Sequence, residues 1–211
     1  MIRHAPARPI RLHRFALSGH CHRVELLSSL LELQAELIDV DLRAGAHRSP
    51  AFLALNAFGQ VPVLEDGEVV VADSNAILVY LAAEYGGGRW LPATGPQLAE
   101  LQRWFSVAAG PLAAGAATAR AHHLFGRTGD VTPARQRAHA LLAAMDAHLS
   151  ARQFLLGDAL SLADIANYAY TARAPEGGVP LDEYPFVRAW LARIESTPRF
   201  VPMPQSSVPL S

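Results

Sequence analysis

The sequence predicts an α/β half followed by an all-α half. Residues 1–88 are expected to fold as β-α-β-α-β-β-α, and residues 96–211 as helices alone. Three observations lead to this fold class. Alternating or short continuous apolar runs, which are typical of strands, occur in the first half, whereas the second half shows helical spacing of its apolar residues. Residues 89–95 are rich in proline and glycine and read as a linker between the two halves.

The first predicted strand covers residues 10–17, where apolar and polar residues alternate. The alternation changes parity near Arg14, which allows a bulge there, and Ser18-Gly19 ends the strand. We expect the basic residues before the strand to be an irregular start rather than a transit peptide. Helical spacing begins at Cys21, with apolar residues at Val24, Leu27, Leu30 and Leu31.

A second strand is predicted over residues 35–42, and proline in a first helical turn predicts that Ser49-Pro50 opens a short helix. Residues 56–59 end that helix. Two strands joined by a helical crossover form a parallel pair.

A tight hairpin is predicted next, because residues 61–64 and 69–71 are strand-like runs on either side of Asp66-Gly67. Asp73-Ser74 then caps a helix that ends at the glycines of residues 86–88. The hairpin completes a small mixed sheet.

The second half is expected to contain a long helix over residues 96–125, kinked at Pro111, and another over residues 133–150. Residues 161–170 begin with a capping-box pattern whose acidic member is Asp164, which we expect to serve folding and not the site. A fourth amphipathic helix is indicated by Val187, Trp190, Leu191 and Ile194.

Composition is that of an ordinary globular protein, with 51% hydrophobic residues, 18% charged residues and a net charge of -1. No basic excess indicates a nucleic-acid or anionic-membrane partner, and no apolar run reaches the roughly 18 residues that span a bilayer. The single cysteine, Cys21, excludes an internal disulfide and a CxxC dithiol, which suits a reducing cytoplasm.

Three segments carry a resemblance to a known family. Residues 18–24 (SGHCHRV) resemble the serine motif of theta- and phi-type glutathione transferases, and residues 44–77 are similar to the phi-type glutathione-binding stretch. Residues 157–165 resemble the capping signature of that family's helical domain. The likeness covers nearly the whole chain, which is identified as a bacterial member of the cytosolic glutathione S-transferase superfamily.

The resemblance implies a thioredoxin-like first domain, a helical second domain that shapes the electrophile pocket, and a homodimer. The implied reaction joins the thiolate of glutathione to a small hydrophobic electrophile, or reduces a peroxide. Glutathione is the co-substrate, and neither a metal nor another cofactor is expected.

Ser18 is the predicted catalytic residue. A free thiol has a pKa near 8.5, and lowering it by about two units requires roughly 2.7 kcal/mol of preferential thiolate stabilisation. A hydroxyl donor at the positive end of a helix can supply that. The alternative is that Ser18 only caps the helix.

Cys21 is the alternative catalytic residue, because the dipole of the first helical turn would favour its own thiolate. It can equally be a small buried residue under the first helix. His20 and His22 flank it, but residues at i and i+2 of a helix point apart, and the adjacent His122-His123 fail the same test. We therefore predict no metal site.

By the resemblance, Gln60, Val61 and a cis Pro62 border the glutathione peptide, and the N–H and C=O of Val61 pair with its cysteine in the manner of an added strand. The alternative is an ordinary proline at the start of a strand.

The resemblance also implies that Ser74 binds the γ-glutamyl carboxylate while Asp73 takes the ammonium group, and that His47 and Arg48 contact the glycine carboxylate. Asp73 can instead be a simple helix cap. The His-Arg pair can be solvated surface.

For the electrophile pocket, the candidates are Trp104 and Phe105, with Ser106 beside them, although a Trp-Phe pair at this spacing also suits a helical core. Two other functions stay open. One is a zeta-type glutathione-dependent isomerase. The segment SGHC of this chain matches the serine-cysteine motif of that type only in part. The other is a non-catalytic relative that binds proteins.

Overall fold

The computed structural model describes residue 6 and residues 8–207. The predicted irregular start of the chain lies mostly outside these residues. The described residues divide into two compact units: those up to Pro92 together with Pro198–Met203, and Ala93–Thr197 together with residues 204–207. The first unit contains a mixed sheet with helices and the second is helical, so the predicted fold class is confirmed.

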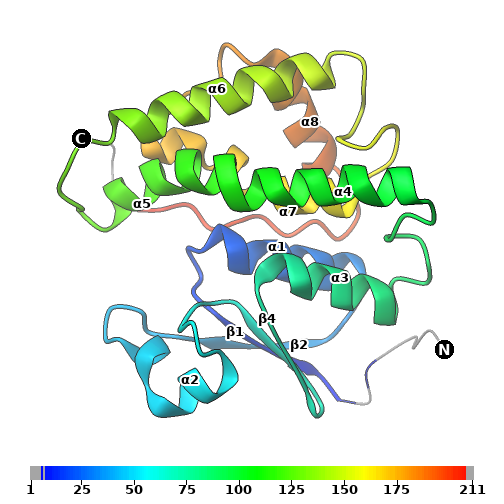
Figure 1. Ribbon diagram of the computed structural model, residues 1–211, viewed down its shortest axis with the longest axis vertical. Coiled ribbons are helices and arrows are strands. Elements are labelled where there is room, and N and C mark those ends of the chain that lie inside the picture. The colour runs from blue at the N-terminus through cyan, green and yellow to red at the C-terminus, as the bar shows by residue number, and fades with distance from the viewer. Residues whose placement is uncertain (1–5, 7, 208–211) are drawn as a thin grey trace. The chain divides into compact units, whose positions relative to one another are not determined.

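The first unit is built on a four-stranded sheet with the strand order β2-β1-β3-β4 (Figure 1). β1 and β2 are parallel, and β3 is antiparallel to both β1 and β4. The strands are β1 (Ile10–Arg14), β2 (Ala35–Asp39), β3 (Val63–Asp66) and β4 (Val69–Ala72).

Two strands are shorter than the sequence pattern predicts. β1 ends at Arg14 without a bulge, because the chain turns there and the Ser18 N–H donates to the Phe15 carbonyl at 2.9 Å. β2 ends at Asp39 because the Asp41 carboxylate accepts hydrogen bonds from two backbone N–H groups just after it, which closes a turn.

Helices cover both faces of the sheet. α1 (Gly19–Leu30) and α3 (Ser74–Tyr85) lie side by side on one face, and α2 (Pro50–Leu55) lies on the other, preceded by the 3-10 turn η1 (Ala46–Arg48) (Figure 1). The core of the first unit contains fully buried side chains, among them Ile10, Leu12, Leu26, Leu27, Leu64, Ile77, Leu78 and Leu81.

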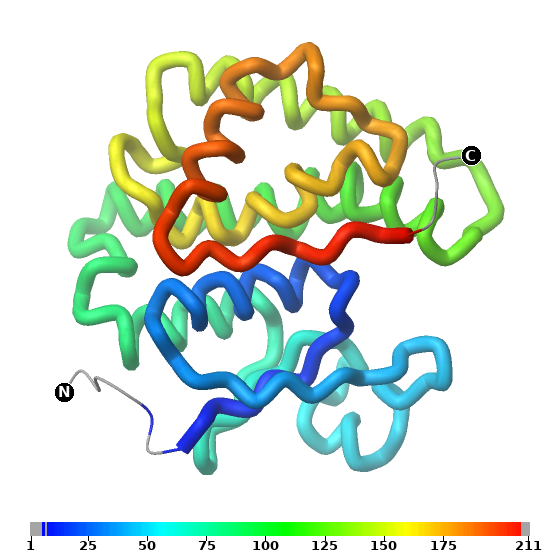
Figure 2. The backbone as a smooth tube through the Cα atoms, turned by 180° about the vertical axis from the view of Figure 1, so that it is seen from behind, coloured from blue at the N-terminus to red at the C-terminus, as the bar shows by residue number. Residues whose placement is uncertain are grey.

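The segment Pro198–Met203 belongs to the first unit although it follows the last helix in sequence. The Ser29 hydroxyl donates to the Arg199 carbonyl at 2.7 Å, and His22 Nε2 lies 2.8 Å from the Val201 carbonyl oxygen. Figure 2 shows this segment, in red, running beside α1, in blue. Nothing in its sequence predicted that the chain returns there.

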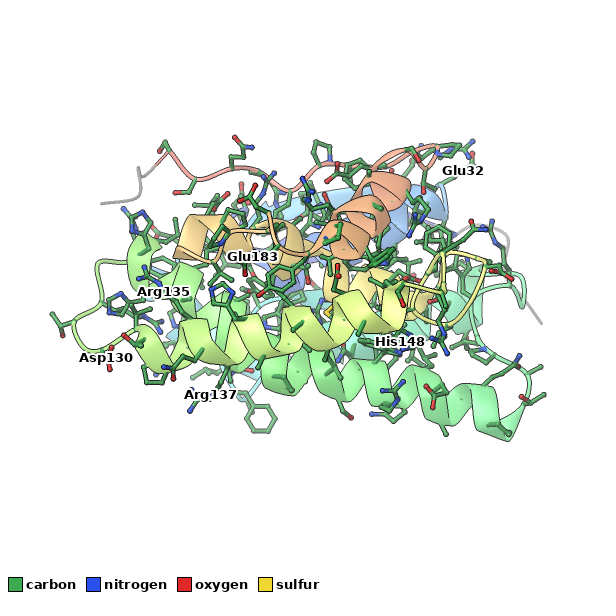
Figure 3. All side chains as sticks on the ribbon, turned by 90° about the horizontal axis from the view of Figure 1, so that it is seen from above. Glu32, Asp130, Arg135, Arg137, His148 and Glu183 are labelled. Carbon is green, nitrogen blue, oxygen red and sulfur yellow. The ribbon has the colours of Figure 1, made fainter. Side chains whose placement is uncertain are left out.

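The second unit contains only helices among its described residues. They are α4 (Gly95–Val107), η2 (Ala108–Ala117), α5 (Thr118–Leu124), α6 (Thr132–Leu149), α7 (Leu162–Ala172), η3 (Ala174–Gly177) and α8 (Pro185–Glu195). Figure 3 shows α6 from above, with Arg135 near its first turn and His148 near its last. No described helix is both long enough and apolar enough to cross a membrane.

The predicted long helix of residues 96–125 is interrupted by a π-helical stretch, η2, with Pro111 inside it. Proline has no N–H to donate within a helix, which favours a local change of hydrogen bonding over a uniform α-helix. Gly115 lies in the same stretch against α6, where a Cβ would come 2.9 Å from the backbone nitrogen of Ala138. The close helix packing therefore requires glycine.

Asp164 organises the polar interior of the second unit. Its Oδ2 accepts from the Ser161 N–H at 2.9 Å and the Ser161 hydroxyl at 2.6 Å, which confirms the predicted capping box. Its Oδ1 accepts from the Leu155 N–H and from the indole N–H of Trp190, both at 2.8 Å. Asp164 thus joins the start of α7 to α8 and to the loop before α7.

Replacing Asp164 by alanine is expected to lower the free energy of unfolding by at least about 3 kcal/mol, because several buried donors lose their acceptor together. Urea unfolding followed by circular dichroism measures this. The exposed Asp158 in the same unit provides the matched control, and its alanine variant should stay within about 0.5 kcal/mol of the wild type. Equal effects of the two substitutions would contradict the role given to Asp164.

Candidate functional site

The predicted site residues of the first unit gather at one end of the sheet. The register pairs His13 with Val63 and Val63 with Ala72, so the end of β1, the start of β3 and the end of β4 lie next to one another. Ser18 comes after the end of β1, Pro62 directly precedes β3, and Asp73 directly follows β4. The sheet register therefore brings together three segments that are far apart in the sequence.

Ser18 is the N-cap of α1. It has extended backbone angles, and its Oγ accepts a hydrogen bond from the Cys21 N–H at 3.3 Å, so the capping alternative is confirmed. A hydroxyl that accepts through its oxygen still has its hydrogen to donate. That hydrogen is directed at the Cys21 sulfur, whose pKa the Ser18 hydroxyl lowers. To donate to a bound sulfur the hydrogen must turn away from Cys21, while the oxygen continues to cap the helix.

Cys21 is unsuited to act as a nucleophile. Its side chain is fully buried, and Sγ accepts a hydrogen bond from the Phe15 N–H at 3.4 Å. Burial raises the pKa of the Cys21 thiol to about 11, although the hydrogen bonds from Ser18 and Phe15 act in the opposite direction. The thiol is therefore protonated at neutral pH, as expected for the buried structural residue that the sequence analysis kept as an alternative.

Asp73 caps α3, with its Oδ1 accepting from the Asn75 and Ala76 N–H groups at 2.8 and 3.0 Å. Its φ of 75° is unusual for a residue other than glycine, and such outliers cluster at functional sites. The Asp73 side chain is exposed while Ser74, the first residue of the helix, is buried. An exposed carboxylate thus stands beside a helix N-terminus, where an anionic group is stabilised.

Two residues at this end of the unit were not among the predicted site residues. His20 Nδ1 lies 3.3 Å from Ser74 Oγ, and Arg23 donates to Ser74 Oγ at 3.2 Å and to Asn75 Oδ1 at 2.8 Å. Burial, and next the charge of Arg23, lower the pKa of His20 to about 3, so its imidazole is neutral. Their spacing of i and i+3 on the first helix was a signal that both face the same neighbour.

The predicted glycine-carboxylate and peptide-binding residues lie in two adjoining loops. Gly59 has a φ of +58°, and a Cβ there would meet the His47 carbonyl oxygen at 3.0 Å, so the two loops pack backbone against backbone. Among the described residues, the buried Nδ1 of His47 has no hydrogen-bond partner. Arg48 is exposed at the end of η1.

The other loop contains the peptide bond between Val61 and Pro62, which is cis, as the resemblance implied. The Gln60 carbonyl accepts from the Asn56 side-chain amide at 2.8 Å, and Val61 packs against a small core that includes Phe52. These contacts hold the segment before β3 in place from both sides.

Trp104 and Phe105, the candidates for the electrophile pocket, are both buried in the second unit. The ring of Trp104 packs edge-on against His148 of α6 with centroids 5.0 Å apart, and Arg103 lies over the same indole. These are the contacts of a helical core, the second of the two interpretations that the sequence allowed.

Among residue 6 and residues 8–207, no group of three or more histidine, cysteine, aspartate and glutamate side chains is placed to hold a metal ion. The flanking histidines of Cys21 have separate partners: His20 contacts Ser74, and His22 contacts the Val201 carbonyl. They do not converge on one point.

The comparisons with known proteins agree over both halves of the chain. Residues 10–83 match the family model "Glutathione S-transferase, N-terminal domain", and residues 121–198 match "Glutathione S-transferase, C-terminal domain". Glutathione S-transferase 3 of Zea mays is 35% identical over an alignment of 206 residues that covers 91% of this chain and 91% of the maize protein. A crystal structure of a glutathione S-transferase from Pseudomonas fluorescens is 34% identical, covers 93% of this chain and 99% of its own, and has a TM-score of 0.87.

Alkylation of the native protein tests the state of Cys21. With a pKa of about 11, the thiol should react with iodoacetamide at pH 8 about two orders of magnitude more slowly than in the urea-unfolded chain, and the rate should rise about tenfold per pH unit. Because the chain has one cysteine, mass spectrometry reads the modification directly. Equal rates in the native and unfolded protein would show that the thiol is reactive.

Proposed function

Because the chain belongs to the glutathione S-transferase superfamily, we propose that it joins the thiolate of glutathione to small hydrophobic electrophiles, with Ser18 as the residue that stabilises the thiolate. The chain is a glutathione transferase; the class of its second substrate and the roles of its residues are the proposal. The observation that carries the proposal is the position of the Ser18 hydroxyl at the N-terminus of the twelve-residue α1, where its oxygen caps the helix.

Two effects act on a sulfur placed beside Ser18. A hydrogen bond from a hydroxyl to an anion contributes about 1.5–3 kcal/mol, and a helix N-terminus adds about 0.3–2 kcal/mol. Their sum covers the roughly 2.7 kcal/mol that a two-unit decrease in thiol pKa requires. Neither effect needs a metal or a redox cofactor.

The other proposed contacts with glutathione come from residues that lie near the same ends of the strands. The tripeptide runs along the segment Gln60 to Pro62, with the Val61 backbone pairing with its cysteine residue. Its γ-glutamyl carboxylate lies at Ser74 and the N-terminus of α3, and Asp73 takes the ammonium group. His47 and Arg48 are assigned to the glycine carboxylate; the unpartnered Nδ1 of His47 supports a polar ligand in that loop.

Several finer points stay proposals. Trp104 and Phe105 remain the candidates for the electrophile pocket, and peroxide reduction is a second use of the same thiolate. The bacterial origin of the chain, its phi- or theta-like serine motif and a cytoplasmic location rest on the resemblance and on the single cysteine. The alternatives are an isomerase of the zeta type and a non-catalytic binding module.

Replacement of Ser18 by alanine is expected to lower kcat/KM for conjugation of a model aryl halide by about tenfold to a hundredfold or more, because the thiolate loses its donor. The matched control is Cys21→Ala, which should change kcat/KM less than about threefold. Stopped-flow absorbance of the conjugate measures both. The reverse order of effects would move the chemistry to Cys21 and to thiol exchange.

Retention of the wild-type protein on immobilised glutathione separates the enzyme from a non-catalytic module. We expect specific elution by free glutathione. A protein that is folded but never retained would favour the binding-module alternative.

A homodimer is proposed from the resemblance alone. Sedimentation equilibrium at micromolar concentration is expected to give twice the mass of the chain, and a single-chain mass under the same conditions would contradict the proposal.

A further inference from the structure

Two side chains of α1 converge on one hydroxyl at the start of α3. We propose that His20 and Arg23 are positioning residues for Ser74, which they hold so that its hydroxyl hydrogen is donated to the α-carboxylate of the γ-glutamyl group. The inference rests on the proposed function, because it assigns two further residues to the same glutathione site.

The Ser74 hydroxyl is contacted by both Arg23 and His20. Arg23 Nη1 donates to Ser74 Oγ at 3.2 Å, and His20 Nδ1 lies 3.3 Å from the same oxygen. Arg23 is 1% exposed and Ser74 is 3% exposed, so water does not compete for these positions. Arg23 also donates to Asn75 Oδ1 at 2.8 Å, which fixes the guanidinium against the first two residues of α3.

A hydroxyl oxygen accepts two hydrogen bonds and donates one. The guanidinium is always charged and can only donate, so it occupies one acceptor position of Ser74 Oγ. His20 then determines where the hydrogen of the Ser74 hydroxyl points. The neutral imidazole of His20 carries one proton, which can be on Nδ1 or on Nε2.

With the ring proton on Nε2, His20 Nδ1 accepts the Ser74 hydrogen and the hydroxyl is satisfied within the protein. With the proton on Nδ1, His20 donates to the second acceptor position, and the Ser74 hydrogen must point to another acceptor. A carboxylate at the N-terminus of α3 is that acceptor. The change moves one ring proton between the two nitrogens by exchange with water, and the net protonation does not change.

Arg23 has a second effect on the same ligand group. Its positive charge lies directly behind the first residues of α3 and adds to the partial positive charge of the helix N-terminus. The pair therefore favours a ligand that carries a carboxylate at this position, whereas the ammonium group of the same residue is left to Asp73.

The test compares three ligands by isothermal titration calorimetry: S-methylglutathione, its analogue without the γ-glutamyl carboxylate (4-aminobutanoyl), and its analogue without the amino group (glutaryl). His20→Ala should weaken binding of the two carboxylate ligands about threefold to tenfold, and binding of the 4-aminobutanoyl analogue less than twofold. Arg23→Met should show the same selectivity with about tenfold or larger losses.

Two conservative variants and one control keep the test independent of folding. His20→Asn keeps a polar atom near the position of Nδ1 and should retain the wild-type preference, whereas His20→Gln moves that atom to the position of Nε2 and should lose it. His22→Ala removes the neighbouring imidazole, which contacts the Val201 carbonyl instead, and should affect all three ligands alike.

Nitrogen NMR of the labelled imidazole gives a direct reading. We expect the proton of His20 to move from Nε2 to Nδ1 when S-methylglutathione is added, and not with the 4-aminobutanoyl analogue. A wild-type protein that does not bind S-methylglutathione refutes the proposed function. Binding by the wild type, with losses independent of the carboxylate or with an unchanged tautomer, overturns the positioning role alone.

Discussion

The first unit depends on one buried charge. Arg23 lies on α1 with almost no exposure, and burying a guanidinium is unfavourable unless its donors are hydrogen-bonded. Arg23 donates to the Ser74 hydroxyl and to the Asn75 side chain, both of which lie on α3. Charged hydrogen bonds contribute about 1.5–3 kcal/mol each, which is enough to fix the start of one helix against the other. This contact ties α1 to the start of α3.

The two helix caps at the site use only part of their polar groups in capping. The Ser18 oxygen accepts from the N–H of Cys21 while its hydrogen is directed at the Cys21 sulfur, and Asp73 caps α3 through Oδ1 while its side chain stays exposed. Capping alone would not distinguish a binding site from an ordinary helix start. What distinguishes this place is the sheet register, which sets the two caps and the Val61–Pro62 segment at the same end of the strands.

The second unit solves the same problem of buried polarity with an anion. Asp164 is fully buried, and burial raises its pKa while the hydrogen bonds from Leu155, Ser161 and Trp190 act against that change. Four donors around one carboxylate tie α7 to α8, so the residue acts in folding, as its capping-box pattern predicted. The role of a polar residue that belongs to a recognisable local motif, here the capping box, can thus be predicted from the sequence alone.

Local patterns in the sequence were sufficient to predict the helices, the strands and the helix caps. The hairpin around Asp66-Gly67, the turn at Ser18 and the caps at Asp73 and Ser161 each depend on residues within a few positions of one another. The contacts that the pattern could not predict join distant segments: Arg23 meets Ser74, 51 positions later, and Pro198–Met203 returns to α1. His20 was considered only as a metal ligand because its true neighbour, Ser74, is remote in sequence.

The central claim is that the Ser18 hydroxyl stabilises the thiolate of bound glutathione. The pKa of that thiol can be read from the far-ultraviolet absorbance of the thiolate in the complex, titrated in the wild type and in Ser18→Ala. The account predicts a pKa about two units below that of free glutathione, and a return close to the free value in the variant. A wild-type pKa equal to that of free glutathione, or one that the substitution leaves unchanged, would contradict it.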